Sequence, residues 1–165
     1  MTNSVVISGS GLWNPPHSIS NEELVDAYNA YATQFNQQNA DEIESGSVTA
    51  KPLSSAEFIQ KASGIRSRYC YMKDGVLDIN RMRPAIPERS EEELSDQAEM
   101  AINAAKLALE AANKSADDID VVIVSCAYTQ RSYPALAIEV QEALGIQGFG
   151  FDMLVACSAA TFALH

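Results

Sequence analysis

Cysteine is scarce in this sequence, and the spacing of its cysteines fits neither a metal site nor a disulfide framework. The three present are Cys70, Cys126 and Cys157, and no two of them form a CxxC pair. Structural zinc sites use close pairs of ligands, and disulfide frameworks use an even number of cysteines. We therefore predict free thiols, a reducing compartment and no bound metal.

Long apolar runs are also lacking, and so is a basic N-terminal region. A membrane-spanning helix needs about 18 or more consecutive apolar residues, and no stretch of this chain approaches that length. The first residues, MTNSVVISGSG, contain neither the basic region nor the long apolar core of a signal peptide. These absences predict a cytoplasmic protein without a membrane segment.

Positive charge is in short supply as well. The 165 residues include 11 Lys and Arg against 22 Asp and Glu, which gives a formal net charge of −11. Nucleic-acid affinity comes mainly from Lys and Arg that neutralise phosphates, so we predict no nucleic-acid partner. A local basic patch would still suit an acidic carrier or a nucleotide phosphate. The hydrophobic fraction of 47% and the length are typical of one folded domain with a substantial core.

Apolar, β-branched runs alternate with helical patterns along the chain. The run at 121–125 (VVIVS) is typical of a strand buried on both faces, and the alanine-rich face of 94–112 favours close packing at the centre of the fold. The alternation predicts an α/β fold with helices on both faces of a mixed sheet. The expected strands are 5–7, 65–72, 121–125 and 149–156, and the expected helices are 21–36, 55–62, 94–112, 134–145 and 159–164.

Several local motifs refine this pattern. Ser20 and Ser90 each begin a capping box, which places a helix start directly after them. Gly9-Ser10-Gly11 is expected to form a tight turn, because a helix-breaking run follows it instead of the rest of a GxGxxG fingerprint. The polar stretch 36–52 indicates either an exposed insertion or the frayed end of the preceding helix, and it fits a lid as well as a simple loop.

Cys157 lies where the strand 149–156 meets the helix 159–164. A helix N-terminus favours thiolate over thiol, and its free N–H groups suit a developing oxyanion. Free cysteine is also among the most buried residue types, so position alone leaves both a nucleophile and a packing residue open. Cys70 and Cys126 lie in or at the end of expected strands, and we expect them only to pack.

Several motifs, in the same order along the chain, resemble the β-ketoacyl-[acyl-carrier-protein] synthase III type of condensing enzyme, which has the thiolase fold. The resemblance covers nearly the whole chain, and its most specific segment is FDMLVACSAATFAL around Cys157. It implies that residues 1–165 form the N-terminal half of a thiolase-like fold, and that the C-terminal half is absent from this chain. The other matching segments are VVISGSGLWNPP, SGIRSR at 63–68, the alanine-rich helix, 121–127, Tyr133-Pro134 and Leu144-Gly145-Ile146.

The resemblance implies an acyltransferase of fatty acid biosynthesis. An acyl group passes from coenzyme A or a carrier thioester to Cys157, and malonyl-carrier protein is then decarboxylated and condensed to give a β-ketoacyl product. No further cofactor is implied. The family's catalytic His and Asn are expected in the missing half, on the same or a separate polypeptide, because His165 lies about 12 Å along a helix from Cys157 and His17 is expected in a surface loop. This chain alone is thus predicted to be inactive, and a homodimer is implied.

The same resemblance implies three substrate-binding residues. Phe58 stands where many members have a tryptophan that stacks on the coenzyme A adenine, although Ala62 replaces the accompanying arginine. Arg66 is expected to meet phosphate groups, and Tyr133 is expected to line the acyl pocket of a neighbouring subunit. Core packing for Phe58, a surface salt bridge for Arg66 and a solvated hydroxyl for Tyr133 remain alternatives.

Two other functions stay open. A thiolase-fold acyltransferase of secondary metabolism would use the same cysteine on another acceptor. A non-catalytic thiolase-fold subunit would keep the fold without the chemistry. The cysteine at its expected strand-to-helix junction favours an enzyme.

Overall fold

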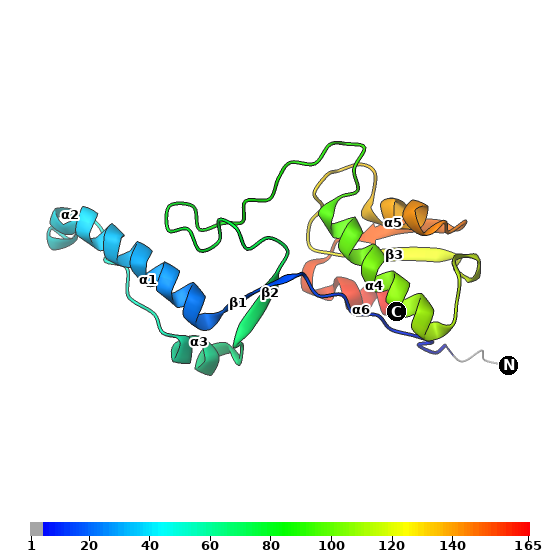
Figure 1. Cartoon of the computed structure of the whole chain (residues 1–165), viewed down its shortest axis with the longest axis horizontal. Helices are drawn as coiled ribbons and strands as arrows, with labels where there is room; N and C mark the ends of the chain where they lie inside the picture. Colours follow the sequence, from blue (N-terminus) through cyan, green and yellow to red (C-terminus); the bar gives the residue numbers. More distant parts are fainter. Residues whose placement is uncertain (1–4) are drawn as a thin grey trace. The chain divides into compact units, whose positions relative to one another are not determined.

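The computed structural model describes residues 5–165, which divide into two compact units (Figure 1). The first unit comprises residues 5–13 and 88–165, and we call it the sheet unit. The second comprises residues 14–87 and is called the insert unit, because its sequence interrupts the first. Each unit has its own helices and its own pair of strands.

The sheet unit is built on two parallel strands, β3 (Val121–Ser125) and β4 (Phe149–Met153). Helix α5 (Leu136–Leu144) connects them, and α4 (Asp96–Ala112) packs against α5. The main buried cluster joins one face of the strands to both helices, and it consists of Ala98, Ile102, Leu136 and Val140, with Val122 and Val124 packed against it. The α/β class is confirmed, and the alanine-rich helix contributes Ala98 and Ile102 to the core cluster.

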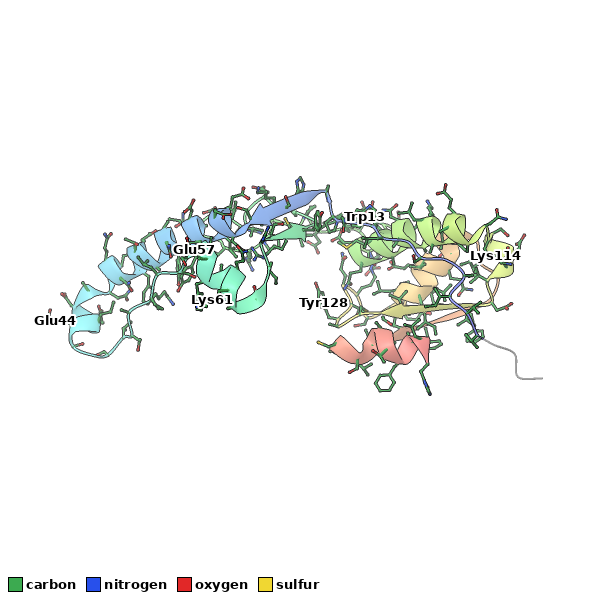
Figure 2. The ribbon with its side chains drawn as sticks, turned by 90° about the horizontal axis from the view of Figure 1, so that it is seen from below. Trp13, Glu44, Glu57, Lys61, Lys114 and Tyr128 are labelled. Carbon is green, nitrogen blue, oxygen red and sulfur yellow. The ribbon has the colours of Figure 1, made fainter. Side chains whose placement is uncertain are left out.

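The other face of these strands carries α6 (Ala159–Leu164), which Figure 2 shows on the opposite side from α4 and α5. The Ser125 hydroxyl, at the end of β3, donates to the Ala159 carbonyl at 3.0 Å and anchors the start of α6. This face is otherwise poorly covered. Its large apolar side chains remain substantially exposed, namely Val121, Ile123, Phe149, Phe151, Phe162 and Leu164.

Two helix starts differ from the sequence-based expectation. The capping box predicted at Ser90 does not begin α4, which starts at Asp96, two residues after the expected position 94. The Ser90–Glu93 contact only closes a turn before the helix, and the N-cap is the fully buried Ser95, whose hydroxyl accepts from the Ala98 N–H at 3.2 Å. Helix α5 begins at Leu136 instead of Pro134. The expected end of α5 is confirmed, because Gly145 terminates it at φ 74°, a left-handed conformation that glycine adopts without strain.

Residues 5–13 are irregular, so the predicted strand at 5–7 and the tight turn after it are wrong. Nothing among residues 5–165 pairs with this segment, and Val5 is 97% exposed. The glycines instead lie against the alanine face of α4: a Cβ on Gly11 would fall 2.1 Å from the Ala104 carbonyl oxygen. The GSG motif is therefore a close-packing motif.

The insert unit contains α1 (Asn21–Gln38), α2 (Ala40–Glu44) and α3 (Ala56–Ser63). The antiparallel strands β1 (His17–Ser20) and β2 (Ser67–Cys70) pair beside them. The capping box at Ser20 is confirmed, and the helix expected at 55–62 is α3, whose N-cap is Ser55. The strand predicted at 65–72 is shorter than expected, and His17 is exposed but lies in β1 and not in a loop.

The stretch 36–52 is ordered, so the frayed-end alternative is wrong. Helix α1 continues to Gln38, and the chain returns along it in an irregular segment. Two asparagine side chains of α1 hold that segment by its backbone: Asn36 bonds both the N–H and the C=O of Lys51 at 2.8 and 2.9 Å, and Asn29 does the same to Ser54 at 2.9 and 3.0 Å. Across residues 5–165, every helix is too short or too polar to cross a membrane.

The contact between Gly11 and α4 gives a stability prediction. Gly11→Ala would place a methyl group within 2.1 Å of backbone oxygen, and we expect a loss of about 2 kcal/mol in the free energy of unfolding, because backbone cannot move aside as a side chain can. Denaturant unfolding measures the loss. Ser10→Ala is the matched control, since Ser10 is exposed between the two glycines. An unchanged midpoint for Gly11→Ala would contradict the close approach.

Candidate active site around Cys157

Cys157 lies in a tight turn between β4 and α6. The strand ends at Met153, and a single 3₁₀ turn, η2 (Ala156–Ser158), leads into the helix. Ala156 has φ 49°, a left-handed conformation that costs energy in any residue except glycine. The thiol is exposed, so Cys157 is not a packing residue of this chain's core. The predicted strand-to-helix junction is present, but Cys157 lies one residue before the N-cap Ser158 and outside the helix.

The other two cysteines are half-buried and free, as expected of packing residues. Burial raises the pKa of the Cys126 thiol, and the nearby Asp152 carboxylate raises it further by disfavouring a second negative charge. The Cys126 N–H donates to the Met153 carbonyl at 3.2 Å, which extends the β3–β4 ladder to the edge of the turn. Within residues 5–165, no three His, Cys, Asp or Glu side chains converge as metal ligands would.

Asp152 connects the strand that leads to Cys157 with the start of α5. Its two carboxylate oxygens accept from the N–H groups of Leu136 and Ala137, at 2.9 and 2.8 Å. The N-cap residue of α5 is Ala135, which has no side-chain acceptor, so Asp152 satisfies N–H groups that the helix cannot satisfy itself. A carboxylate at this position is also favoured by the helix dipole.

Tyr133 lies in the loop between β3 and α5, and its side chain is 88% exposed. Carboxyl ends of parallel strands meet at the same edge of a sheet, so the loop that carries Tyr133 and the turn that carries Cys157 both leave the sheet at that edge. Exposure leaves Tyr133 free to contact another chain or a substrate, and it fits the solvated alternative equally well.

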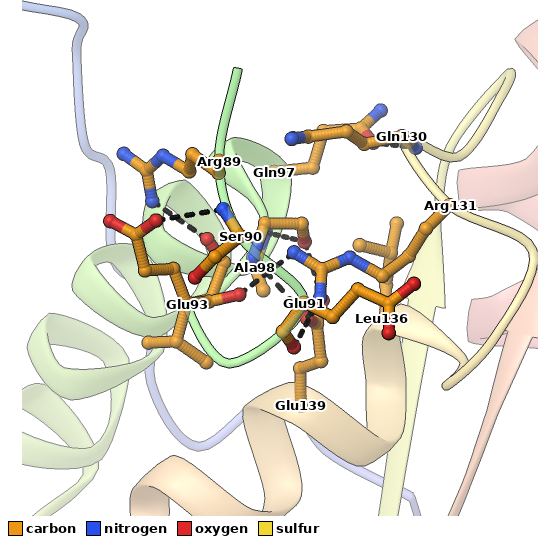
Figure 3. A network of polar contacts seen from close by, with 12 residues as sticks. Arg89, Ser90, Glu91, Glu93, Gln97, Ala98, Gln130, Arg131, Leu136 and Glu139 are labelled. Carbon is orange, nitrogen blue, oxygen red and sulfur yellow. Dashed lines mark hydrogen bonds and ion pairs between the residues drawn. The ribbon is translucent and has the colours of Figure 1, made fainter. Parts of the chain in front are cut away.

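A polar network holds that loop against the N-terminal end of α4 (Figure 3). Arg131 donates to the carbonyl oxygens of Glu91 and Glu93 at 2.9 and 2.7 Å. Its guanidinium also lies 3.7 Å from the carboxylate of Glu139, which is buried in α5 and accepts from both the N–H and the hydroxyl of Ser95. The sequence analysis missed this network. Its only signal was a glutamate among the apolar residues of LAIEVQEAL.

Phe58 and Arg66 belong to the insert unit. Phe58, on α3, is 66% exposed, which contradicts core packing within the described residues. It lines a groove of about 770 Å³ whose other walls are Leu24, Val25 and Tyr28 of α1, Pro52–Ser55, Ile59 and Met82. Arg66 is exposed, and its carbonyl accepts from the Asn21 N–H at 3.0 Å. The structure thus groups Cys157 with Tyr133 in one unit and Phe58 with Arg66 in the other.

The curated proteins most similar in the comparison include two acyl-carrier-protein synthases. β-Ketodecanoyl-[acyl-carrier-protein] synthase of Pseudomonas aeruginosa is 53% identical over 141 residues, which cover 86% of this chain and 40% of that protein. β-Ketoacyl-[acyl-carrier-protein] synthase III of Granulibacter bethesdensis is 28% identical over 161 residues, covering 96% of this chain and 36% of that protein. No family model matches the chain.

A solved structure of similar fold is 3-oxoacyl-[acyl-carrier-protein] synthase III from Aquifex aeolicus. It superposes with a TM-score of 0.63 at 24% identity, over 96% of this chain and 37% of that one. The thiolase-like α/β fold is thereby confirmed. The chain spans about two fifths of the length of these relatives.

The environments of the thiols predict their order of alkylation. With iodoacetamide at about pH 8, Cys157 should react before Cys126. Cys157 is exposed to the reagent, whereas Cys126 is half-buried and its raised pKa leaves it a smaller thiolate fraction. Peptide mass spectrometry of the native protein measures both rates. Asp152→Asn should accelerate labelling of Cys126, since it removes the repulsion that raises its pKa. Faster labelling of Cys126 than of Cys157 in the unaltered protein would contradict this environment.

The Asp152 contact predicts a stability effect. Asp152→Ala should lower the free energy of unfolding by about 1–3 kcal/mol, because two helix N–H groups lose their acceptor. Thermal or denaturant unfolding reports the loss. Asp117→Ala is a suitable control, because Asp117 is exposed in the 3₁₀ helix η1 (Ala116–Asp118). Equal stability of the two variants would argue against the anchoring role of Asp152.

Proposed function

This chain belongs to the β-ketoacyl-[acyl-carrier-protein] synthase III-like family, and on that premise we propose that Cys157 is the acyl-accepting nucleophile of a condensing enzyme. The observation that carries the proposal is an exposed thiol in a strained turn at the carboxyl end of a parallel strand, inside the segment most specific to the family. Strained backbone is often retained where it presents a functional group.

In the first half-reaction the Cys157 thiolate attacks the carbonyl carbon of an acyl thioester. A carbon–sulfur bond forms to Cys157, the bond to the donor sulfur breaks, and the proton lost from Cys157 goes to the departing thiolate. In the second half-reaction malonyl-carrier protein loses carbon dioxide, and the resulting carbanion attacks the acyl-enzyme and releases the Cys157 thiolate. Covalent catalysis thereby divides one difficult step into two easier ones.

The acyl donor we propose has an eight-carbon chain. The relative that is 53% identical is named for a β-ketodecanoyl product, and condensation with a malonyl group adds two carbons. Coenzyme A is the proposed carrier of the donor, with Phe58 stacking on the nucleotide and Arg66 near its phosphates. Tyr133 is proposed to contact the acyl chain of a neighbouring subunit in a homodimer. The expected setting is fatty acid biosynthesis in the cytoplasm.

The remaining length of the relatives is proposed to supply the His and Asn that polarise the malonyl thioester and stabilise its enolate. We propose that it also covers the exposed face of β3, β4 and α6. Apolar patches of this kind are usually buried against another protein surface. The chain by itself should therefore bind the acyl donor poorly and should not catalyse the condensation.

The test is intact-mass analysis of the full-length protein that carries this chain after incubation with octanoyl-coenzyme A. We expect one octanoyl adduct, mapped to Cys157 and absent from Cys157→Ala, because that variant lacks the attacking sulfur. Cys126→Ala is the matched control and should still be acylated. Addition of malonyl-carrier protein should remove the adduct and release a β-ketodecanoyl product.

Other outcomes discriminate among the alternatives. An adduct that persists in Cys157→Ala would sink the nucleophile assignment. An adduct on Cys157 that malonyl-carrier protein does not discharge favours acyl transfer to another acceptor, as in secondary metabolism. A folded protein that is not acylated by donors of any length favours the non-catalytic subunit.

A further inference from the structure

We propose that Glu139 is a positioning residue that fixes the Tyr133 loop through Arg131, and so sets the length of acyl chain that the enzyme accepts. The inference rests on the proposed function, because it takes Cys157 as the acylated residue and Tyr133 as a wall of the acyl pocket. Glu139 itself touches neither the acyl group nor the thiol in this proposal. It acts through the loop.

The burial of Glu139 is the first observation. Only 6% of the residue is exposed, although it is an ionisable group on a helix whose other buried residues are Leu136, Ala137 and Val140. Burying a carboxylate is costly unless its oxygens are paired. Here each oxygen accepts one bond from Ser95, from the N–H at 3.2 Å and from the hydroxyl at 2.5 Å, and Ser95 is fully buried.

The second observation is the position of Arg131. Its guanidinium lies 3.7 Å from Glu139 and also donates to two backbone carbonyls of the segment before α4. A single arginine therefore joins the loop, the start of α4 and the first turns of α5, with the buried carboxylate as its counter-charge. Figure 3 shows the Arg131 side chain directed into this cluster.

A second set of contacts fixes the residues just before Arg131. The Gln130 side chain accepts from the Asp96 N–H at 2.9 Å, and the Gln130 N–H donates to the Gln97 side chain at 3.0 Å. Gln97 in turn donates to the Tyr128 carbonyl at 2.8 Å. The loop is thus held along 128–131, and Arg131 is the last point of attachment before Tyr133.

The third observation is the shortness of the span that carries Tyr133. It runs from Arg131, held by Glu139, to Leu136, held by Asp152, with four residues between. The Tyr133 side chain is 88% exposed and contributes little packing of its own. Its backbone position is therefore determined by the two anchors, and weakening one of them frees the loop at that end. A pocket wall that moves discriminates less well between chain lengths.

The test compares Glu139→Gln with Glu142→Gln in the full-length protein. Glu142 is a matched control, because it is an exposed glutamate on the same helix. Rates of Cys157 acylation are measured with hexanoyl-, octanoyl- and decanoyl-coenzyme A. In Glu139→Gln we expect the ratio between the preferred donor and the donor two carbons longer to fall about threefold to tenfold. Glu142→Gln should keep the ratio of the unaltered protein.

A double-mutant cycle with Tyr133→Ala separates positioning from a general loss of structure. If Glu139 acts through Tyr133, the double variant should show the same donor ratio as Tyr133→Ala alone, whereas independent effects would multiply. Tryptic cleavage after Arg131 gives a readout that does not depend on activity. It should accelerate in Glu139→Gln and not in Glu142→Gln, because trypsin needs the arginine side chain released from its partners.

Arg131→Lys covers the case in which Glu139→Gln does not fold. It keeps the positive charge beside Glu139 but lacks the planar guanidinium that donates to two carbonyls at once. The ratio between the preferred donor and the longer donor should therefore fall, as in Glu139→Gln. If the folded variants acylate Cys157 with an unchanged donor ratio, or if the effects multiply with Tyr133→Ala, the positioning role is overturned while the proposed function stands. If the unaltered protein is not acylated at all, the proposed function fails and this inference with it.

Discussion

The arrangement of the sheet unit depends on the hydrogen bonds of the Asp152 carboxylate, which connect β4 to the start of α5. Asp152 lies on β4, five residues before Cys157, and it accepts the first free N–H groups of α5. The residue at the N-cap, Ala135, offers no side-chain acceptor, so this one carboxylate supplies the hydrogen bonds between the helix start and the strand. The turn with Cys157 and the loop with Tyr133 are built outward from it.

The two faces of the β3–β4 pair are chemically different, and the alternation of side chains along each strand explains why. Val122 and Val124 meet the buried helices, whereas Phe149 and Phe151 point toward the sparsely covered face that α6 shares. In a sequence read alone, the run VVIVS predicts burial on both faces. The structure supplies the cover for one face, and the proposed remainder of the protein supplies it for the other.

Most of the fold was predictable because it depends on local patterns. The capping box at Ser20, the end of α5 at Gly145 and the strand 121–125 are all determined by residues within a few positions of each other. The strand at 5–7 was mispredicted because a strand exists only with a neighbour, and β-branched content says nothing about whether one is present. The start of α4 was mispredicted because its N-cap is Ser95 and not Ser90. The Ser95 hydroxyl is bonded to Glu139, 44 positions away, and no local pattern indicates that contact.

The candidate site was predictable to a lesser degree. Cys157 was predicted from its position between strand and helix and from the surrounding motif, and the structure exposes its thiol in the turn before α6. The residues that hold its surroundings, Asp152, Glu139 and Arg131, carry no local signature, because each acts on a backbone or side chain distant in sequence. A charged residue inside an otherwise apolar helical stretch was the available hint, and it indicates only that a partner exists.

The asparagines on α1 have a consequence for how the insert unit tolerates sequence change. Asn29 and Asn36 are two helical turns apart and so lie on one face of the helix. The amide side chain of Asn29 bonds the backbone N–H and C=O of Ser54, and that of Asn36 bonds those of Lys51. Any residue with a backbone N–H can make these two hydrogen bonds. Proline is accommodated at position 52 because only its carbonyl is bonded, by the Tyr28 hydroxyl. The path of this segment along α1 therefore tolerates changes of side chain, apart from Lys51, whose ammonium lies over the rings of Tyr31 and Phe35.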